Sequence, residues 1–320
     1  LNELISIISP LYGGTFIDCT FGQGGYSKKI LENKNNQVLA IDRDKDSYLY
    51  SKELEKNYKK RFSFHNIKFS EINKLKFKTK DLKAIIFDLG YSLNQIKNSK
   101  KGLSFNSTGK LDMRMGINDF SAKEVISYMS EENLIKIFKI FGEEKYSKKI
   151  VRKIVEIRKT QEIKTEDLTK IIDSIKKYKN KKINNSTQVF QAIRIFVNKE
   201  ITELMNGLIN SFNLLPIGGI ITVVTFHSLE DKIVKFFFNN YSKNKSRSSR
   251  YLPENKIEQA YLFEAYKNKV LKPSKKEVEI NNRARSAKLR FAIRSNTDFQ
   301  YPHELIDKFK NYLELESANV

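Results

Sequence analysis

Three glycines follow directly after an apolar run near the start of the chain, in the stretch FIDCTFGQGGYS. The run Gly13–Phe21 is rich in Ile, Phe and Thr and predicts a buried strand. Residues 26–33 (YSKKILEN) then predict a helix, and residues 36–44 (NQVLAIDRD) predict a second buried strand. Two strands joined through a helix predict a parallel sheet, because parallel strands need such a crossover. We therefore expect an α/β fold.

The three glycines, Gly22, Gly24 and Gly25, lie at the turn between the first strand and the helix. A missing side chain at such a turn lets the backbone approach a ligand or adopt a positive φ. Asp42 follows Gly22 by 20 residues, at the end of the second strand, where an acid can bind a ribose hydroxyl. The turn therefore predicts a site for a cofactor that contains a nucleoside.

The glycine spacing distinguishes between two kinds of cofactor. NAD sites use G-x-G-x-x-G, whereas here Lys28 stands three residues after Gly25 and the third spaced glycine is absent. Asp18 precedes the turn, and its carboxylate would repel a pyrophosphate but suit a cation. S-adenosylmethionine carries a sulfonium and an ammonium group, so the pattern favours it. On these residues alone, a tight turn with a chance acid stays an alternative.

A third buried strand is predicted in LKAIIFDLG (82–90), and it ends at Asp88. Ligands of open α/β sheets bind beyond the carboxyl ends of the strands. A single acid at a strand end is commonly a loop or helix cap. Three such acids, Asp18, Asp42 and Asp88, are instead expected to meet in one crevice.

Seven segments carry a family resemblance. They occur in the order FIDCTFGQGGYSKKILE, IFDLGYSLNQ, GLSFNSTGKLDMRM, FGEEKYSKKIVRKIV, FQAIRIFVNKE, TFHSLEDKIVKFF and NNRARSAKLR. Together they resemble the bacterial S-adenosylmethionine-dependent methyltransferases that act on N4 of a cytidine in small-subunit (16S) ribosomal RNA. The resemblance runs over residues 1–294. It implies a Rossmann-like methyltransferase sheet with an inserted all-helical domain.

The resemblance also implies site residues. Cofactor contacts are expected at Gly24, Gly25, Tyr26, Asp42, Phe69, Asp88 and Gln95, and the glycine pattern adds Gly22. The chain departs from the family pattern at Tyr26, where His is usual, and at Gln23, where Arg is usual. No metal is expected, because His65, His227 and His303 show no metal-ligand spacing.

The single cysteine bears on the chemistry. Methylation of cytosine C5 by the usual route needs a cysteine nucleophile, but Cys19 is expected inside a buried strand. An exocyclic amine needs only positioning and hydrogen-bond acceptors, so a direct in-line transfer is expected. The candidates for catalytic groups are Asp88, Asp112 and His227. A purely structural role for this segment, in which Ser228 and Asp231 form a capping box directly after His227, is an equal alternative to the catalytic one.

Arginine side chains are the candidates for contact with RNA, because their planar guanidinium groups match phosphate oxygens. The candidates are Arg114, Arg283 and Arg285. The last two precede a strand predicted in KLRFAIR (288–294), with Leu289, Phe291 and Ile293 on one face. A solvated edge strand with no ligand contact is the alternative for this stretch.

The predicted organisation is a discontinuous methyltransferase domain, 1–116 and 186–320, around a helical insertion at 117–185 that is expected to recognise RNA. Ser121 and Glu124 predict a capping box, and Thr165 is predicted to cap another helix. Residues 187–212 predict one long amphipathic helix. A helix in 143–159 is expected to place four apolar residues on one face: Tyr146, Ile150, Ile154 and Ile157.

The net charge of +22 favours a polyanionic partner, although lysine is abundant throughout the chain. The expected partner is 16S ribosomal RNA or the small ribosomal subunit, with no membrane; a homodimer is left open. A lone cysteine fits the cytoplasm, and because the chain opens on Leu1 we expect a few native residues to precede it. Rival functions are a nicotinamide oxidoreductase, a non-catalytic RNA-binding protein and a methyltransferase of another RNA.

Overall fold

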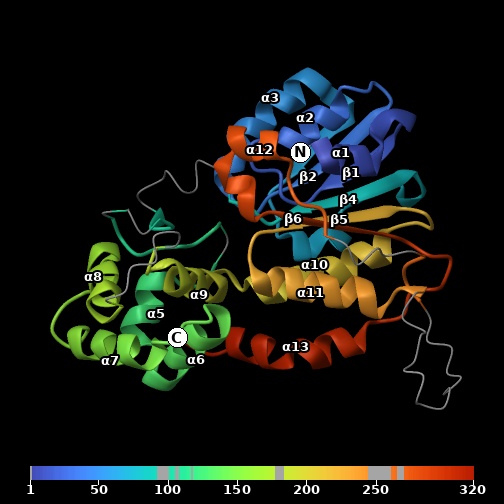
Figure 1. The fold of residues 1–320 in the computed structure, drawn as a ribbon. Coiled ribbons are helices and arrows are strands. Elements are labelled where there is room, and N and C mark those ends of the chain that lie inside the picture. Colours follow the sequence, from blue (N-terminus) through green and yellow to red (C-terminus); the bar gives the residue numbers. More distant parts are fainter. Residues whose placement is uncertain are drawn as a thin grey trace, which may run out of the picture. The chain divides into compact units, whose positions relative to one another are not determined.

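The structure is a computed structural model, shown in Figure 1, that describes residues 2–91, 101–104, 107, 109–116, 118–176, 184–243, 261–264 and 270–320. The chain forms two compact units. The first comprises residues 1–90 and 203–308, and the second comprises residues 91–202 and 309–320. The chain passes from one unit to the other three times: between residues 90 and 91, within α10 (Glu200–Leu214) and within α13 (His303–Glu316).

The first unit is built on a six-stranded sheet with the order β3-β2-β1-β4-β5-β6. Its strands are β1 (Gly14–Asp18), β2 (Asn36–Ile41), β3 (Phe62–His65), β4 (Leu82–Asp88), β5 (Ile220–Thr225) and β6 (Lys288–Ile293). All neighbouring pairs are parallel except β5 and β6, which are antiparallel. The predicted α/β fold of the Rossmann-like methyltransferase type is confirmed.

Helices cover both faces of this sheet (Figure 1). One face carries α1 (Asn2–Ile8), α2 (Gly25–Leu31), α3 (Tyr48–Tyr58) and α12 (Lys275–Ile280), while α11 (Ser228–Asn240) and the part of α10 in this unit lie on the other. Short 3-10 helices connect these elements: η1 (Pro10–Tyr12), η2 (Lys45–Ser47), η3 (Lys59–Arg61), η4 (Phe69–Lys74), η5 (Thr79–Asp81) and η8 (Asn282–Ser286). The central strands β1, β4 and β5 are buried over most of their length on both faces, which explains the apolar runs in their sequences.

The second unit is helical, and its described residues contain no strand. Its helices are α5 (Ala122–Tyr128), α6 (Glu131–Phe141), α7 (Ser147–Ile157), α8 (Thr165–Ile175) and α9 (Thr187–Asn198). This compact unit includes more of the chain than the predicted insertion at 117–185, since it also includes residues 91–116, 186–202 and 309–320. The boundaries of the insertion and its role in RNA recognition stay predictions. None of the described helices is long and apolar enough to cross a bilayer.

Local predictions in the second unit had mixed outcomes. The capping box of Ser121 and Glu124 is confirmed. The predicted cap at Thr165 is wrong, because Lys164 is the N-cap and the Thr165 hydroxyl donates to the Gly109 carbonyl at 3.0 Å. Tyr146 was placed wrongly on the apolar face of α7, since it precedes the helix and is 45% exposed.

The single long helix predicted at 187–212 is also wrong. It is two helices, α9 and α10, separated at Lys199, whose φ is +49°. The guanidinium of Arg194 donates to both carboxylate oxygens of Glu200, at 2.8 and 2.9 Å, and so joins the two helices across the break. The apolar periodicity continues through both helices, so it gave no sign of one left-handed residue.

Candidate cofactor-binding site

Three carboxylates lie at the same edge of the sheet. Asp18 and Asp88 are the last residues of β1 and β4, and Asp42 directly follows β2. Because β1 lies between β2 and β4 and all three are parallel, their carboxyl ends lie side by side. The expected meeting of the three acids is therefore observed.

Asp42 organises the loops around it. Its Oδ2 accepts hydrogen bonds from the Gly22 amide at 2.7 Å and the Ser47 hydroxyl at 2.9 Å, and its Oδ1 accepts one from the Asp44 amide at 2.8 Å. Burial raises the pKa of Asp42, and these donors oppose that effect. A carboxylate offers about four acceptor positions, so one position on Oδ1 is left for a ligand hydroxyl.

Asp88 is held from three sides. The Tyr26 hydroxyl donates to Oδ2 at 3.0 Å, the Gly90 amide donates to Oδ1 at 3.0 Å, and the Asp88 amide donates to the Thr20 hydroxyl at 2.7 Å. Burial raises the pKa of Asp88 and also raises that of Tyr26 well above its usual value. Tyr26 is therefore a neutral donor that fixes the orientation of the Asp88 carboxylate.

Asp18 lies deepest of the three and is 0% exposed. It accepts hydrogen bonds from the Ser27 hydroxyl at 2.7 Å and the Thr20 amide at 3.3 Å. Burial is the main cause that raises its pKa to about 6, and the charges of Asp42 and Asp88 add to it. Asp42 and Asp88 therefore lie close enough for their charges to disfavour ionisation of Asp18.

The glycine turn connects this edge to α2. Gly24, the N-cap of α2, has a φ of +79°, and a Cβ there would lie 2.8 Å from the ring of Phe21. Gly25 is different, because a Cβ built there would meet no atom within 4 Å. Glycine is needed at Gly24 for the backbone conformation, whereas at Gly25 the space is open to a ligand.

Phe69 and Gln95 complete the predicted cofactor contacts. Phe69 begins η4 and packs edge-on against Phe87, with ring centroids 5.3 Å apart. Gly207 of α10 leaves room for that ring, since a Cβ there would lie 2.6 Å from it. Gln95 lies outside the described residues, and its predicted contact is not placed.

His227 is the N-cap of α11 and forms a capping box with Glu230. The Glu230 amide donates to His227 Nδ1 at 3.4 Å, and the Glu230 carboxylate accepts from the His227 amide at 3.2 Å. The capping box predicted for Ser228 and Asp231 is therefore wrong by one residue. Asp231 instead pairs with Lys288 and Arg290, at 3.0 and 2.7 Å, which fastens α11 to β6.

Asp112 and Arg114 belong to the second unit and bind each other. The Arg114 Nε and a terminal nitrogen donate to the two oxygens of Asp112, at 2.8 and 3.0 Å. Burial would raise the pKa of Asp112, but the hydrogen bonds and charge of Arg114 outweigh it and lower that pKa. In this state Asp112 is an ionised carboxylate that positions an arginine.

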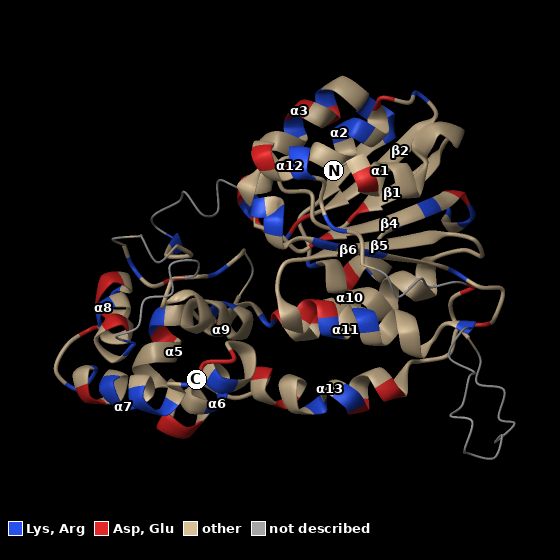
Figure 2. Cartoon of the chain, in the orientation of Figure 1, with Lys and Arg blue, Asp and Glu red and all other residues tan. Residues whose placement is uncertain are grey.

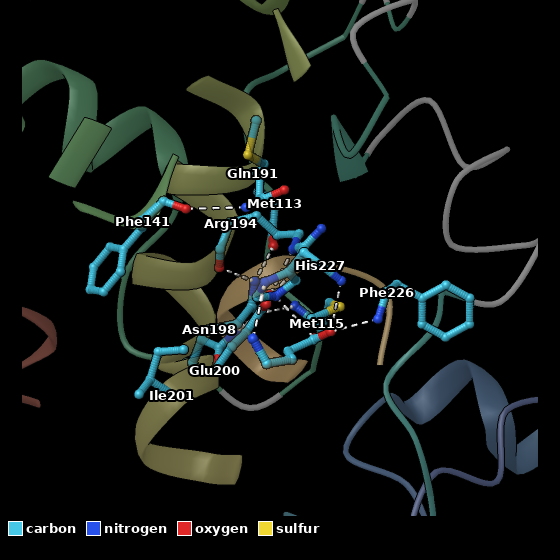
Figure 3. A network of polar contacts seen from close by, with 12 residues as sticks. Met113, Met115, Phe141, Gln191, Arg194, Asn198, Glu200, Ile201, Phe226 and His227 are labelled. Atoms are coloured by element: carbon cyan, nitrogen blue, oxygen red, sulfur yellow. Dashed lines mark hydrogen bonds and ion pairs between the residues drawn. The ribbon is translucent and has the colours of Figure 1, made fainter. Parts of the chain in front are cut away.

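One residue with a structural role was missed from the sequence. Asn198, the last residue of α9, accepts from the Met115 amide at 2.8 Å and donates to the Met113 carbonyl at 2.9 Å (Figure 3). It therefore fixes the segment on both sides of Arg114. The signal was a lone polar residue on the apolar face of a predicted helix, in IFVNKE.

The last two predicted site residues lie in η8. Arg283 and Arg285 are both exposed there, on either side of the buried Ala284. Directly after them, the strand predicted at 288–294 is confirmed as β6, which pairs with β5 at the edge of the sheet. Arg290 in that strand is not solvated, because it is 6% exposed and bound to Asp231.

The chain is similar to known proteins over nearly its whole length. A model of the MraW methylase family matches residues 1–295. The protein named ribosomal RNA small subunit methyltransferase H from Rickettsia rickettsii (strain Sheila Smith) is 42% identical over 294 residues, which cover 91% of this chain and 95% of that protein. Its namesake from Rickettsia akari (strain Hartford) is 40% identical over 294 residues, 91% of this chain and 96% of that protein.

Among solved structures, an rRNA methylase from Streptococcus thermophilus covers 92% of this chain and 95% of its own, with 7% identity and a TM-score of 0.41. The family match spans nearly the whole chain, and the two relatives exceed 90% coverage on both sides. The chain therefore belongs to the MraW methylase family, a membership that confirms the predicted class of S-adenosylmethionine-dependent methyltransferase.

Proposed function

We propose that this chain transfers the methyl group of S-adenosylmethionine to the exocyclic N4 amine of a cytidine in small-subunit ribosomal RNA. The observation that carries the proposal is the row of acids Asp42, Asp18 and Asp88 beside the glycine turn, with Asp18 fully buried between the other two strands' ends. The names of the relatives supply the RNA. We place the activity in the cytoplasm, where a lone thiol such as Cys19 stays reduced.

The cofactor fits the residues that are present. The open acceptor position on Asp42 suits a ribose hydroxyl, and the free space at Gly25 lets the backbone approach the ligand closely. The three acids suit the positive sulfonium and ammonium groups. They would oppose the negative pyrophosphate of NAD, which disfavours the oxidoreductase alternative.

The chemistry at the base is proposed from Cys19 and Asp88. Cys19 is 1% exposed, and burial raises the pKa of its thiol well above the usual value, so it suits a core position and not a nucleophile for C5. When bound, the cofactor would supply an electrophilic methyl group. The S–C bond would break as the C–N bond forms at N4, S-adenosylhomocysteine would be the leaving group, and the proton lost from N4 would pass to water. Asp88, oriented by Tyr26, would accept a hydrogen bond from an N–H of the amine and so stabilise the positive charge that develops on N4.

The other catalytic and RNA-binding residues are also proposals. Asp112 and His227 are kept as candidate acceptors, although each is engaged in its own unit with Arg114 or Glu230. The exposed pair Arg283 and Arg285 would bind phosphates. The helical unit would recognise the RNA. A homodimer is kept as an alternative to a monomer.

Binding and turnover test the proposal together. Calorimetry should show binding of S-adenosylhomocysteine and none of NAD; the reverse would favour an oxidoreductase, and binding of neither would favour a non-catalytic RNA-binding protein. Methyl transfer should occur on the structured small subunit or its RNA, with little on a generic duplex, because pairing buries the N4 amine. Equal turnover on random duplex RNA would contradict the proposed substrate.

A further inference from the structure

Helix α7 contains several Lys and Arg residues, drawn as blue segments in Figure 2, and they form a stripe of positive charge on its exposed face. Between residues 145 and 159 the chain has seven Lys and Arg residues and one Glu. The apolar residues Ile150, Val151 and Ile154 are buried in the helical unit. At about 100° per residue, four exposed cations of the helix fall on the opposite side: Lys148, Lys149, Arg152 and Lys153. Lys145 and Lys159 are exposed just beyond the two ends of the helix.

Acidic side chains neutralise little of this stripe. Lys153 pairs with Glu156 at 2.9 Å, and Arg152 lies 3.8 Å from Glu131 with 75% of its side chain exposed. Lys148 and Lys149 have no ion-pair partner within the described parts of the chain. The positive charges therefore face solvent. Their mutual repulsion destabilises the folded unit unless an anionic partner binds there.

A lysine-rich composition does not explain this stripe, because the neighbouring helices are balanced. In α8, Lys170 stands with three acids, and in α6 two lysines stand with Glu131 and Glu132. In α6, moreover, Lys136 is paired with Glu132 at 2.6 Å. A general excess of lysine would raise the charge of every exposed face, whereas here it gathers on α7.

We propose that the exposed face of α7 binds the phosphate backbone of RNA. This inference rests on the proposed function, since it takes the ribosomal RNA substrate as its partner. Cationic side chains that contact phosphates release condensed counterions, which drives association. A basic helix that binds a membrane needs an exposed apolar face, but the apolar face of α7 is packed inside the unit. The observations therefore favour RNA over an anionic membrane.

A triple variant tests the inference: Lys148→Gln, Lys149→Gln and Arg152→Gln. Glutamine keeps the helix propensity and removes three charges from exposed positions, so the fold should be retained. The matched control removes three charges from exposed lysines of the first unit, with Lys56→Gln, Lys60→Gln and Lys235→Gln. Binding of a small-subunit ribosomal RNA transcript and of S-adenosylhomocysteine is measured for both variants over a range of salt concentrations.

The α7 variant should bind the transcript about 10- to 100-fold more weakly near 0.1 M salt, with a salt slope flatter by about 2. Its affinity for S-adenosylhomocysteine should not change, and the control should bind RNA like the parent. An equal loss in both variants would assign the effect to net charge and overturn the inference, as would an unchanged RNA affinity in the α7 variant.

The two proposals fail separately. If the parent protein methylates the RNA and the α7 variant binds it normally, the proposed function stands and the role of α7 is wrong. If the parent transfers no methyl group but the α7 variant still loses RNA affinity and salt dependence, the role of α7 stands and the proposed function is wrong. Parent protein that binds phosphatidylserine vesicles and not RNA would overturn the choice of partner.

Discussion

Replacement of Asp42 by alanine should weaken cofactor binding without unfolding the protein. The Oδ1 atom of Asp42 has one acceptor position left after the Asp44 amide, and the ribose hydroxyl would take it. Loss of a hydrogen bond to a charged group costs about 1.5–3 kcal/mol, which corresponds to about a ten- to hundredfold weaker affinity. Calorimetric titration with S-adenosylhomocysteine measures this change directly.

Asp42→Ala also removes the acceptor of the Gly22 amide and the Ser47 hydroxyl, so the glycine turn could loosen. Ser47→Ala is the control, because it removes one bond inside the same network and leaves the carboxylate in place. We expect Ser47→Ala to bind the cofactor within a few-fold of the parent. Unchanged affinity in a folded Asp42→Ala protein would refute the ribose assignment, and an equal loss in Ser47→Ala would assign the effect to the turn.

Three further predictions concern other residues. Burial raises the pKa of Asp18 to about 6 in the folded state, so its ionisation lowers the free energy of unfolding as pH rises from about 4 to 6, by about 3 kcal/mol in total. In chemical denaturation, Asp18→Asn should flatten this part of the pH dependence. A variant whose stability changes with pH just as the parent's does would contradict this prediction. Tyr26→Phe removes a donor that lowers the pKa of Asp88, so the acidic limb of the methyl-transfer pH profile should move to higher pH; an unmoved limb would argue against Asp88. Lys199→Gly should raise stability by about 0.5–1 kcal/mol, because glycine adopts the left-handed conformation of Lys199 without strain; a lower melting temperature would contradict this.

Most of the sheet could be predicted from the sequence because its central strands, such as β1 and β4, are buried on both faces. Strand β3 (Phe62–His65) was not predicted, since it is short and only partly buried. Continuous apolar runs such as AIIFD mark such strands, and the acids that end them mark the ligand edge. The glycine turn was also visible, since its residues follow one strand directly. Sequence order then placed Asp18, Asp42 and Asp88 together without any knowledge of distances.

The errors arose where one backbone residue or one side chain decides the outcome. The break at Lys199 leaves the apolar period of α9 and α10 intact, so periodicity predicted one helix. The cap of α11 was assigned to Ser228 because serine is a common N-cap, but the His227 side chain takes that role. The position of Asn198 on an apolar helix face was a local signal, but its hydrogen-bond partners, Met113 and Met115, lie far away in sequence and could not be predicted.

The central claim is that the methyl group is placed on the N4 amine of a cytidine. The most direct measurement is transfer of a labelled methyl group from S-adenosylmethionine to 16S ribosomal RNA or small subunits, followed by digestion and identification of the modified nucleoside. The account predicts labelled N4-methylcytidine at one position, with no transfer by the Asp88→Ala variant. Label in 5-methylcytidine, in another RNA only, or in no nucleoside at all would contradict it.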